Sequence, residues 1–250
     1  MAVGRTNAAA KGGGGIDYST KPQITFDGKW SNWHIEFYDG VPYWEALFSS
    51  SGTLTNFGAS VQADAWGIGG GGGGDMRFAS GVAGYGGGSG YLAMASAILI
   101  AAQSTMAITI GAGGKSSENG GSTNFGSLSA LGGYHGFIWN NQSSQGKGGS
   151  NGGKTDNSTQ AGENGTPGDG KIMSKFFSVE HNKEYGARGA LKPGGGSTEY
   201  GGGGGGYLDV GAPGSGSGHG FGGGGGGGTN STNYDEFGRS GCLIIRIKAA

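Results

Sequence analysis

Unbroken glycine constrains the fold of this chain more than any other feature of its sequence. Blocks 69–74, 201–206 and 222–228 contain glycine alone. Glycine loses more backbone entropy on ordering than any other residue and brings no side chain to bury, so isolated blocks of this kind stay disordered. Gly-X-Y repeats are absent from these blocks, which excludes a collagen triple helix. The blocks can therefore fold only if their backbones bond to one another.

Such bonding has a simple geometry. A glycine segment in the extended threefold conformation makes no internal hydrogen bonds, so each N–H and C=O points outward toward a neighbour. Without Cβ atoms, parallel segments can approach closely and bond laterally. Aromatic and β-branched stretches frame the blocks, and a flexible Gly/Ser linker lacks such stretches. We predict a mostly irregular, all-β chain, in which a small β module precedes a sandwich of polyglycine type II helices capped by short strands.

Changes in amino-acid composition divide the chain into three parts. Residues 1–20 form a polar arm expected to dock on a partner, residues 21–66 a small β-rich module, and residues 67–250 a glycine-rich domain with exposed loops. Alternating or apolar runs predict strands. These are Gln23–Phe26, Trp33–Tyr38, Tyr43–Ser49, Val61–Ile68, Ile98–Ala101, Met106–Ile110 and Cys242–Lys248. We expect Asp27-Gly28 and Asp39-Gly40 to supply turns between the first strands, and Ile98–Ala101 and Met106–Ile110 to form a pair.

Tryptophans concentrate in the proposed β module, at Trp30, Trp33, Trp44 and Trp66. Their rings can stack on sugars, but aromatic side chains of a small β module more often form its core. We therefore expect a core role for them and keep a carbohydrate-binding role as the alternative.

Composition also limits the partners. The chain carries 16 basic and 17 acidic residues, a net charge of −1, so it has no basic surface for nucleic acid. The single cysteine, Cys242, rules out an internal disulfide and fits assembly in a reducing cytoplasm. The first fifteen residues have neither a basic start nor an apolar stretch, so we expect no export by the secretory route.

Three stretches carry a resemblance to a known family. They are SGTLT at 51–55 with VQADAWGIGGGGGGD at 61–75, then STMAITIGAGG at 104–114 with GGSTNFGSLSALGG at 120–133, and GRSGCLIIRIK at 238–248. In this order they resemble the glycine-rich domains of phage tail and fibre-tip adhesins. The resemblance implies a polyglycine-helix sandwich whose loops bind a host receptor, either an outer-membrane protein or a surface glycan. It also implies a place in the virion, and contacts with other tail proteins through the N-terminal region. The chain departs from those adhesins in its N-terminal region, where we recognise no counterpart of the β module 21–66 as a whole.

We expect the receptor-binding residues in loops between glycine segments, where aromatics stand beside Asn, His and Ser. The candidates are Tyr134, His135, Phe137, Trp139, Asn140, Phe176, Phe177, His181, Tyr185, Tyr234 and Phe237. The alternative is that these aromatics pack against neighbouring glycine helices. Tail fibres are commonly trimeric, so we expect a homotrimer.

No motif predicts an enzyme. The glycine pattern at 67–72 satisfies a dinucleotide-binding fingerprint only because glycine is so abundant, and no helix or distal acid follows it. His34, His135, His181 and His219 lie far apart, and the acidic residues lack the facing pair of a glycosidase. We expect no catalytic residue, no metal and no cofactor. A glycan depolymerase is the main enzymatic rival, but the solenoid repeats typical of such enzymes are missing. Two non-enzymatic alternatives also stay open, a purely structural tail component and a bacterial glycine-rich surface adhesin.

Overall fold

The structure, a computed structural model, describes residues 18–38, 40–74, 86–139, 142–144, 221–224 and 237–249, with the backbone alone at 18, 137–139 and 142–144. Within these ranges the chain consists almost entirely of antiparallel strands, plus one 3-10 turn, η1, at Tyr18–Thr20. The predicted all-β, largely irregular fold class is confirmed.

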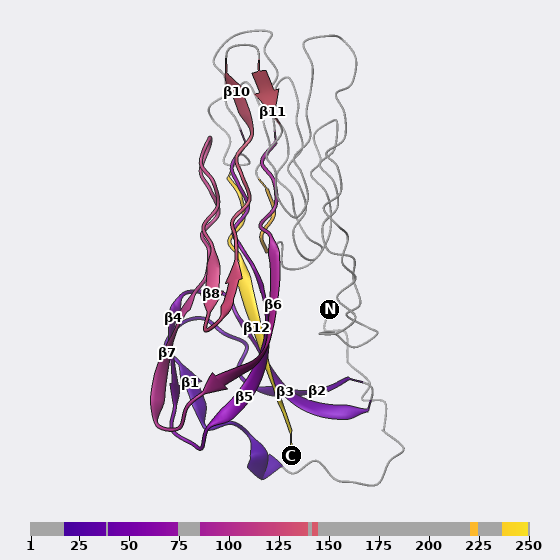
Figure 1. The fold of residues 1–250 in the computed structure, drawn as a ribbon, viewed down its shortest axis with the longest axis vertical. Coiled ribbons are helices and arrows are strands. Elements are labelled where there is room, and N and C mark those ends of the chain that lie inside the picture. Colours follow the sequence, from indigo (N-terminus) through magenta and orange to yellow (C-terminus); the bar gives the residue numbers. More distant parts are fainter. Residues whose placement is uncertain are drawn as a thin grey trace, which may run out of the picture.

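Two five-stranded sheets and one hairpin make up the described fold. The first sheet has the order β1 (Ile24–Phe26), β4 (Gly52–Asn56), β7 (Ser104–Thr109), β8 (Thr123–Phe125) and β9 (Leu128–Ala130). The second has the order β2 (His34–Tyr38), β3 (Val41–Phe48), β12 (Cys242–Lys248), β5 (Val61–Ile68) and β6 (Leu92–Ile100). The hairpin pairs β10 (Phe137–Trp139) with β11 (Gln142–Ser144). The sheets lie at one end of the long axis and the hairpin at the other, with glycine-rich segments between them (Figure 1).

The core of the molecule lies between the two sheets. In β12, Leu243, Ile245 and Ile247 alternate toward it and are at most 6% exposed. Burying one such side chain stabilises the fold by about 1.5–3 kcal/mol. The intervening residues Cys242 and Ile244 lie on the opposite face of the same sheet, in a second buried cluster with Trp66 and Ile68. The second sheet is therefore buried on both faces around its central strand.

Strands that are neighbours along the chain do not always belong to the same sheet. β1 and β2 follow each other in sequence but belong to different sheets, so no turn at Asp27-Gly28 pairs them. The expected pair of β6 and β7 is also wrong, because β6 pairs with β5 in the second sheet and β7 with β4 in the first. Each sheet contains strands from both sides of residue 66, the boundary that composition suggests.

Residues 69–74 continue directly from β5, and their N–H groups donate to a different neighbour at each step. The bonds, 2.9–3.1 Å long, run from Gly69 to Tyr91 O, Gly70 to Gly121 O, Gly71 to Arg239 O, Gly72 to Gly88 O and Gly73 to Glu118 O. The fourth and fifth bonds return to the chain segments reached by the first and second. This repeat of three residues is the period of extended threefold helices.

Within the described ranges, six other segments surround 69–74. In order around it, these are 86–91, 131–136, 118–121, 111–117, 237–241 and 221–224. Backbone hydrogen bonds also join each segment to the next, closing the ring. One bond for each junction is Gly88 N to Tyr134 O, Gly120 N to Gly133 O, Gly121 N to Ala112 O, Gly238 N to Gly114 O, Arg239 N to Gly223 O and Gly90 N to Gly222 O.

This ring provides the lateral backbone bonding predicted for block 69–74. Block 201–206 lies outside the described residues, and only 222–224 of block 222–228 lie within them. The left-handed helix type stays a prediction.

Candidate functional site

Tyr134 and His135, two of the predicted receptor-binding residues, lie in segment 131–136 at the surface of the bundle. The Tyr134 side chain is 51% exposed, and its ring meets that of Tyr91 edge to face at 6.5 Å. The backbone N–H of His135 donates to Asn119 Oδ1 at 3.0 Å. These residues thus have a fixed backbone and, at Tyr134, an exposed aromatic ring. Their receptor-binding role stays a prediction.

The three-residue period explains why Tyr134 faces solvent. In an outer segment of the bundle, every third residue points away from the neighbouring segments. In segment 131–136, Leu131 and Tyr134 are both exposed for this reason, at 57% and 51%. Ala112 and Lys115 are exposed in segment 111–117 for the same reason. Side chains can therefore stand along the bundle at this spacing without entering it.

Two more candidates, Phe137 and Trp139, belong to β10, whose hairpin with β11 lies at the end of the bundle farthest from the sheets (Figure 1). Their side chains are not described. The candidates Asn140, Phe176, Phe177, His181, Tyr185 and Tyr234 lie outside the described residues.

Phe237 does not join Tyr134 in one surface. It is 39% exposed and lies in segment 237–241. This segment stands three places from 131–136 in the ring of six, so the two lie on opposite sides of residues 69–74. One receptor patch containing both Tyr134 and Phe237 is therefore incompatible with the described bundle.

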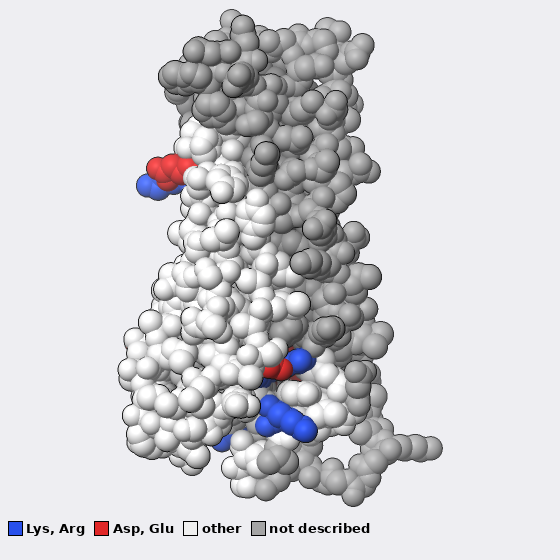
Figure 2. Space-filling view, viewed as in Figure 1, with Lys and Arg blue, Asp and Glu red and all other residues white. Residues whose placement is uncertain are grey.

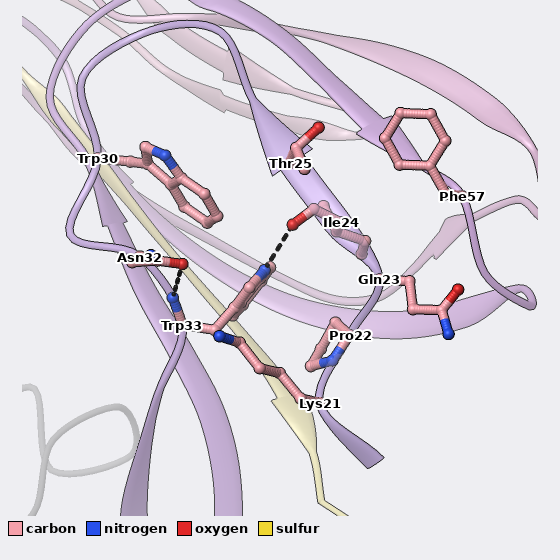
Figure 3. Close-up of a pocket in the computed structure, with 9 residues that line it drawn as sticks. All are labelled: Lys21, Pro22, Gln23, Ile24, Thr25, Trp30, Asn32, Trp33 and Phe57. Atoms are coloured by element: carbon pink, nitrogen blue, oxygen red, sulfur yellow. Dashed lines mark hydrogen bonds between the residues drawn. The ribbon is translucent and has the colours of Figure 1, made fainter. Parts of the chain in front are cut away.

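A groove of about 450 Å³ lies at the sheet end of the molecule (Figure 3). It is lined by Lys21, Pro22, Gln23, Ile24, Thr25, Trp30, Asn32, Trp33 and Phe57. It is a shallow surface groove open to solvent, and not an enclosed cavity. Aromatic surface and short polar side chains share its lining.

The aromatic groups of this groove are held by packing and hydrogen bonds. Trp33 is 6% exposed, and its Nε1 donates to Ile24 O at 3.1 Å, which ties the loop before β2 to β1. The Trp30 ring stacks on Phe48, with centroids 5.6 Å apart and an interplanar angle of 21°. Phe57 remains 55% exposed although its backbone N–H donates to Gln23 O at 2.8 Å.

The expected core role of the tryptophans is confirmed for three of the four. Trp33, Trp44 and Trp66 are at most 6% exposed, whereas Trp30 is half-buried and lines the groove. Phe57 was not among the residues predicted from the sequence to take part in a site. A large aromatic beside Gly58, just after a strand, was the available signal, because such a residue stands in a turn and not in a core.

A polar cluster occupies the other face of the second sheet. The Tyr38 hydroxyl donates to Glu45 Oε2, and the Arg246 guanidinium lies 4.9 Å and 4.8 Å from the ring centres of Tyr38 and Tyr43. Arg246 also pairs with Asp64 at 3.5 Å. Burial raises the pKa of Glu45 to about 7, against the lowering effects of the Tyr38 hydrogen bond and Arg246. Burial of the Tyr38 hydroxyl, and after it the negative charge of the neighbouring Glu45, raises the pKa of Tyr38 above its ordinary value.

Charge is sparse on the described surface. Figure 2 shows charged side chains of this face in two places, over the sheets and on one side of the glycine bundle. Among the described residues no three His, Cys, Asp or Glu side chains gather as metal ligands. The described part of the chain also contains no helix with the length and hydropathy needed to cross a membrane.

Comparison with known proteins adds one match. No curated protein matches this sequence. The family described as a glycine-rich domain matches residues 49–248, which cover β4 to β12 and every segment of the glycine bundle. The match spans four fifths of the 250 residues, and the chain therefore belongs to this family of glycine-rich domains.

Proposed function

We propose that this chain is a tail or fibre-tip protein of a bacteriophage or phage-like particle, and that it binds a receptor on the host cell surface. The observation that supports this most is the place of the β10–β11 hairpin, which ends the glycine bundle on the side away from the sheets (Figure 1). Residues predicted to bind the receptor, Phe137 and Trp139, lie in this hairpin. Loops on a rigid scaffold are common positions for recognition.

The bundle supports the proposal because it provides a rigid backbone scaffold, while the residues at its end are free to vary in sequence. The N–H groups of Gly69 to Gly73 in its central segment donate to backbone carbonyls, so side chains at its end can change without repacking a core. The three-residue period further supports polyglycine type II helices in this bundle. The receptor is an outer-membrane protein or a surface glycan, and the protein acts without catalysis or nucleic acid. We further propose a homotrimer in the virion that contacts other tail proteins through residues 1–20.

Exchange of the hairpin tests the receptor-binding proposal. Residues 137–144 are replaced by a Gly/Ser segment of equal length, which leaves the bond between Gly136 N and Gly73 O in place. We expect unchanged thermal unfolding and loss of binding to host cells. A matched control, Met94→Ala with Leu99→Ala, removes two exposed apolar side chains from β6 at the sheet end and should retain binding. Full host binding by the folded exchange variant contradicts the proposal and favours a purely structural tail component.

A further inference from the structure

We propose that the groove between Trp30, Trp33 and Phe57 binds an anionic sugar ring. This site lies at the sheet end of the molecule, away from the β10–β11 hairpin, and the proposal stands independently of the receptor-binding role of that hairpin (Figures 1 and 3).

Aromatic surface that stays accessible on a fixed backbone is the first argument. Phe57 exposes 55% of its surface although its turn is anchored from two sides. Its N–H donates to Gln23 O, and its carbonyl accepts from Gln103 Nε2. Trp30 is held by Phe48 and meets Trp33 edge to face at 6.0 Å. Figure 3 shows Trp30 and Phe57 on opposite sides of the Ile24–Thr25 stretch. Rigid aromatic faces can stack on a sugar ring at low entropic cost.

Polar groups at the rim are the second argument. Asn32 adopts a left-handed backbone conformation, with φ at 64°, which Asn tolerates better than most residues. Its Oδ1 accepts from Trp33 N at 3.0 Å, and this bond sets the direction of the amide, whose NH₂ is a donor. Gln23 and Thr25 add an amide and a hydroxyl. A sugar presents hydroxyls for such groups beside an apolar ring face, whereas a lipid chain would leave them unpaired.

The positive charge at the groove favours a ligand that carries a negative charge. Lys21 is the one charged residue among the nine that line it, and Figure 3 draws its side chain extending toward Asn32 and Trp33. A carboxylate or phosphate on the sugar complements this ammonium. A peptide added as a strand along the edge of β1 fits less well, because Ile24 O already accepts from Trp33 Nε1.

Titration of the full chain tests the site. The probes are D-glucuronate and glucose 6-phosphate, with glucose as the neutral sugar, and acetate and inorganic phosphate as anions without a ring. The measurement is the chemical shift of the Trp30 and Trp33 indole N–H groups. We expect saturable shifts with the two anionic sugars, binding about tenfold weaker for glucose, and no saturation with the two simple anions. The preferred probe of the pair identifies the anion as carboxylate or phosphate.

Two surface variants separate stacking from charge. Phe57→Ala should weaken binding of either anionic sugar about tenfold, and Lys21→Gln should reduce it to the level of glucose while leaving glucose binding unchanged. The controls are Phe37→Ala, which removes another partly exposed aromatic, and Lys115→Gln, which removes an exposed lysine of the bundle. Thermal unfolding confirms that each variant is folded.

Three results would overturn the proposal. They are an absence of saturable shifts with both anionic sugars, equal losses in the variants and their controls, and saturation by acetate or phosphate alone. The hairpin exchange leaves all nine groove residues intact. Loss of host binding in that variant, with or without sugar binding, therefore bears only on the function proposed for the hairpin.

Discussion

From Gly69 to Gly73, the backbone of the neighbouring segments leaves room for nothing larger than a hydrogen atom on Cα. A Cβ at Gly71 would lie 1.9 Å from Gly223 O, and one at Gly73 would lie 1.8 Å from Lys115 O. Real Cβ atoms essentially never come closer than 3.0 Å to such groups. Glycine is required here by the close approach of backbones, not by a left-handed φ. Ala112 shows the complementary case, because its Cβ is at an exposed position of the ring.

Gly71→Ala should therefore destabilise the protein by about 3 kcal/mol or more, since the added carbon forces segment 221–224 outward and breaks backbone hydrogen bonds that cost about 1–3 kcal/mol each. Ala112→Ser adds an atom at an outward position of a neighbouring segment and should change stability by less than about 0.5 kcal/mol. Equilibrium unfolding in denaturant measures both. Similar unfolding midpoints for the two variants would contradict the close packing of the bundle.

Glu45 should make stability depend on pH. Burial raises the pKa of Glu45 in the folded chain to about 7, above its ordinary value of 4.5. The folded state thus binds this proton more tightly than the unfolded state does. Its stabilising contribution is fully present below about pH 4.5 and is lost as the pH rises through about 7, by roughly 3 kcal/mol in total.

The matched variant is Glu45→Gln, which retains the shape of the side chain and the Tyr38 contact but does not titrate. The free energy of unfolding of the variant minus that of the unmodified protein should increase between pH 4.5 and 7. Taking the difference cancels the contributions that are common to both proteins. A difference that stays flat or falls over this range would show that Glu45 is ionised in the folded chain.

Where strands become glycine segments, the hydrogen-bond pattern must change, and Thr123 of β8 bridges two of these changes. Its side chain is fully buried, and its Oγ1 donates to Ile68 O at 2.7 Å and accepts from Gly111 N at 3.0 Å. Ile68 is the last residue of β5, and Gly111 begins the segment that follows β7. One hydroxyl thus joins the ends of strands from both sheets.

Thr123→Val keeps the shape of the side chain and removes this hydroxyl. Both Ile68 O and Gly111 N then lose a buried partner, and at about 1–3 kcal/mol for each the expected loss of stability is about 2–6 kcal/mol. Thr53→Val in β4 makes the same chemical change at an exposed position and should cost much less. Thermal unfolding of the pair is the measurement, and equal unfolding temperatures would show that the junction does not depend on this bond.

At the scale of the whole molecule, the sheets and the bundle are one continuous structure. β5, β7 and β9 run into bundle segments 69–74, 111–117 and 131–136, and segments 86–91 and 237–241 run into β6 and β12. Strand pairing therefore brings the segments together in register, which reduces the entropy that the bundle loses when it forms. The bundle and sheets should unfold together.

Amide hydrogen exchange tests this cooperativity. The N–H groups of Gly71 and Gly72 are enclosed by the ring and should exchange only when the whole protein unfolds. The Ala97 N–H, which bonds to the Asp64 carboxylate in an exposed position, should exchange through local opening and much faster. Exchange of Gly71 at the rate of Ala97 would mean that the bundle opens separately from the sheets.

Much of the local structure follows from the sequence alone. Alternation and apolar runs predicted β2, β3, β5 and β12 closely, because side-chain period is a local property of a strand. Unbroken glycine likewise predicted lateral backbone bonding, since blocks without side chains have no other means of order. Tyr134 was expected in a loop between glycine segments, but it lies within bundle segment 131–136 with its side chain exposed, because only lateral pairing shows which stretches join the bundle.

Only the tertiary structure decided which elements meet. The insertion of β12 between β3 and β5, more than 170 residues away in sequence, depends on long-range pairing that no local pattern encodes. The central place of 69–74 is decided in the same way, because glycine blocks are locally identical and only their flanking strands distinguish them. The groove, too, arises where the turn of Phe57 comes beside the loop of Trp30 and Trp33. The sequence by itself thus determined which local structure each segment can adopt. The packing of the two sheets decided which segments pair, because contacts between residues distant along the chain select among partners that are locally equivalent.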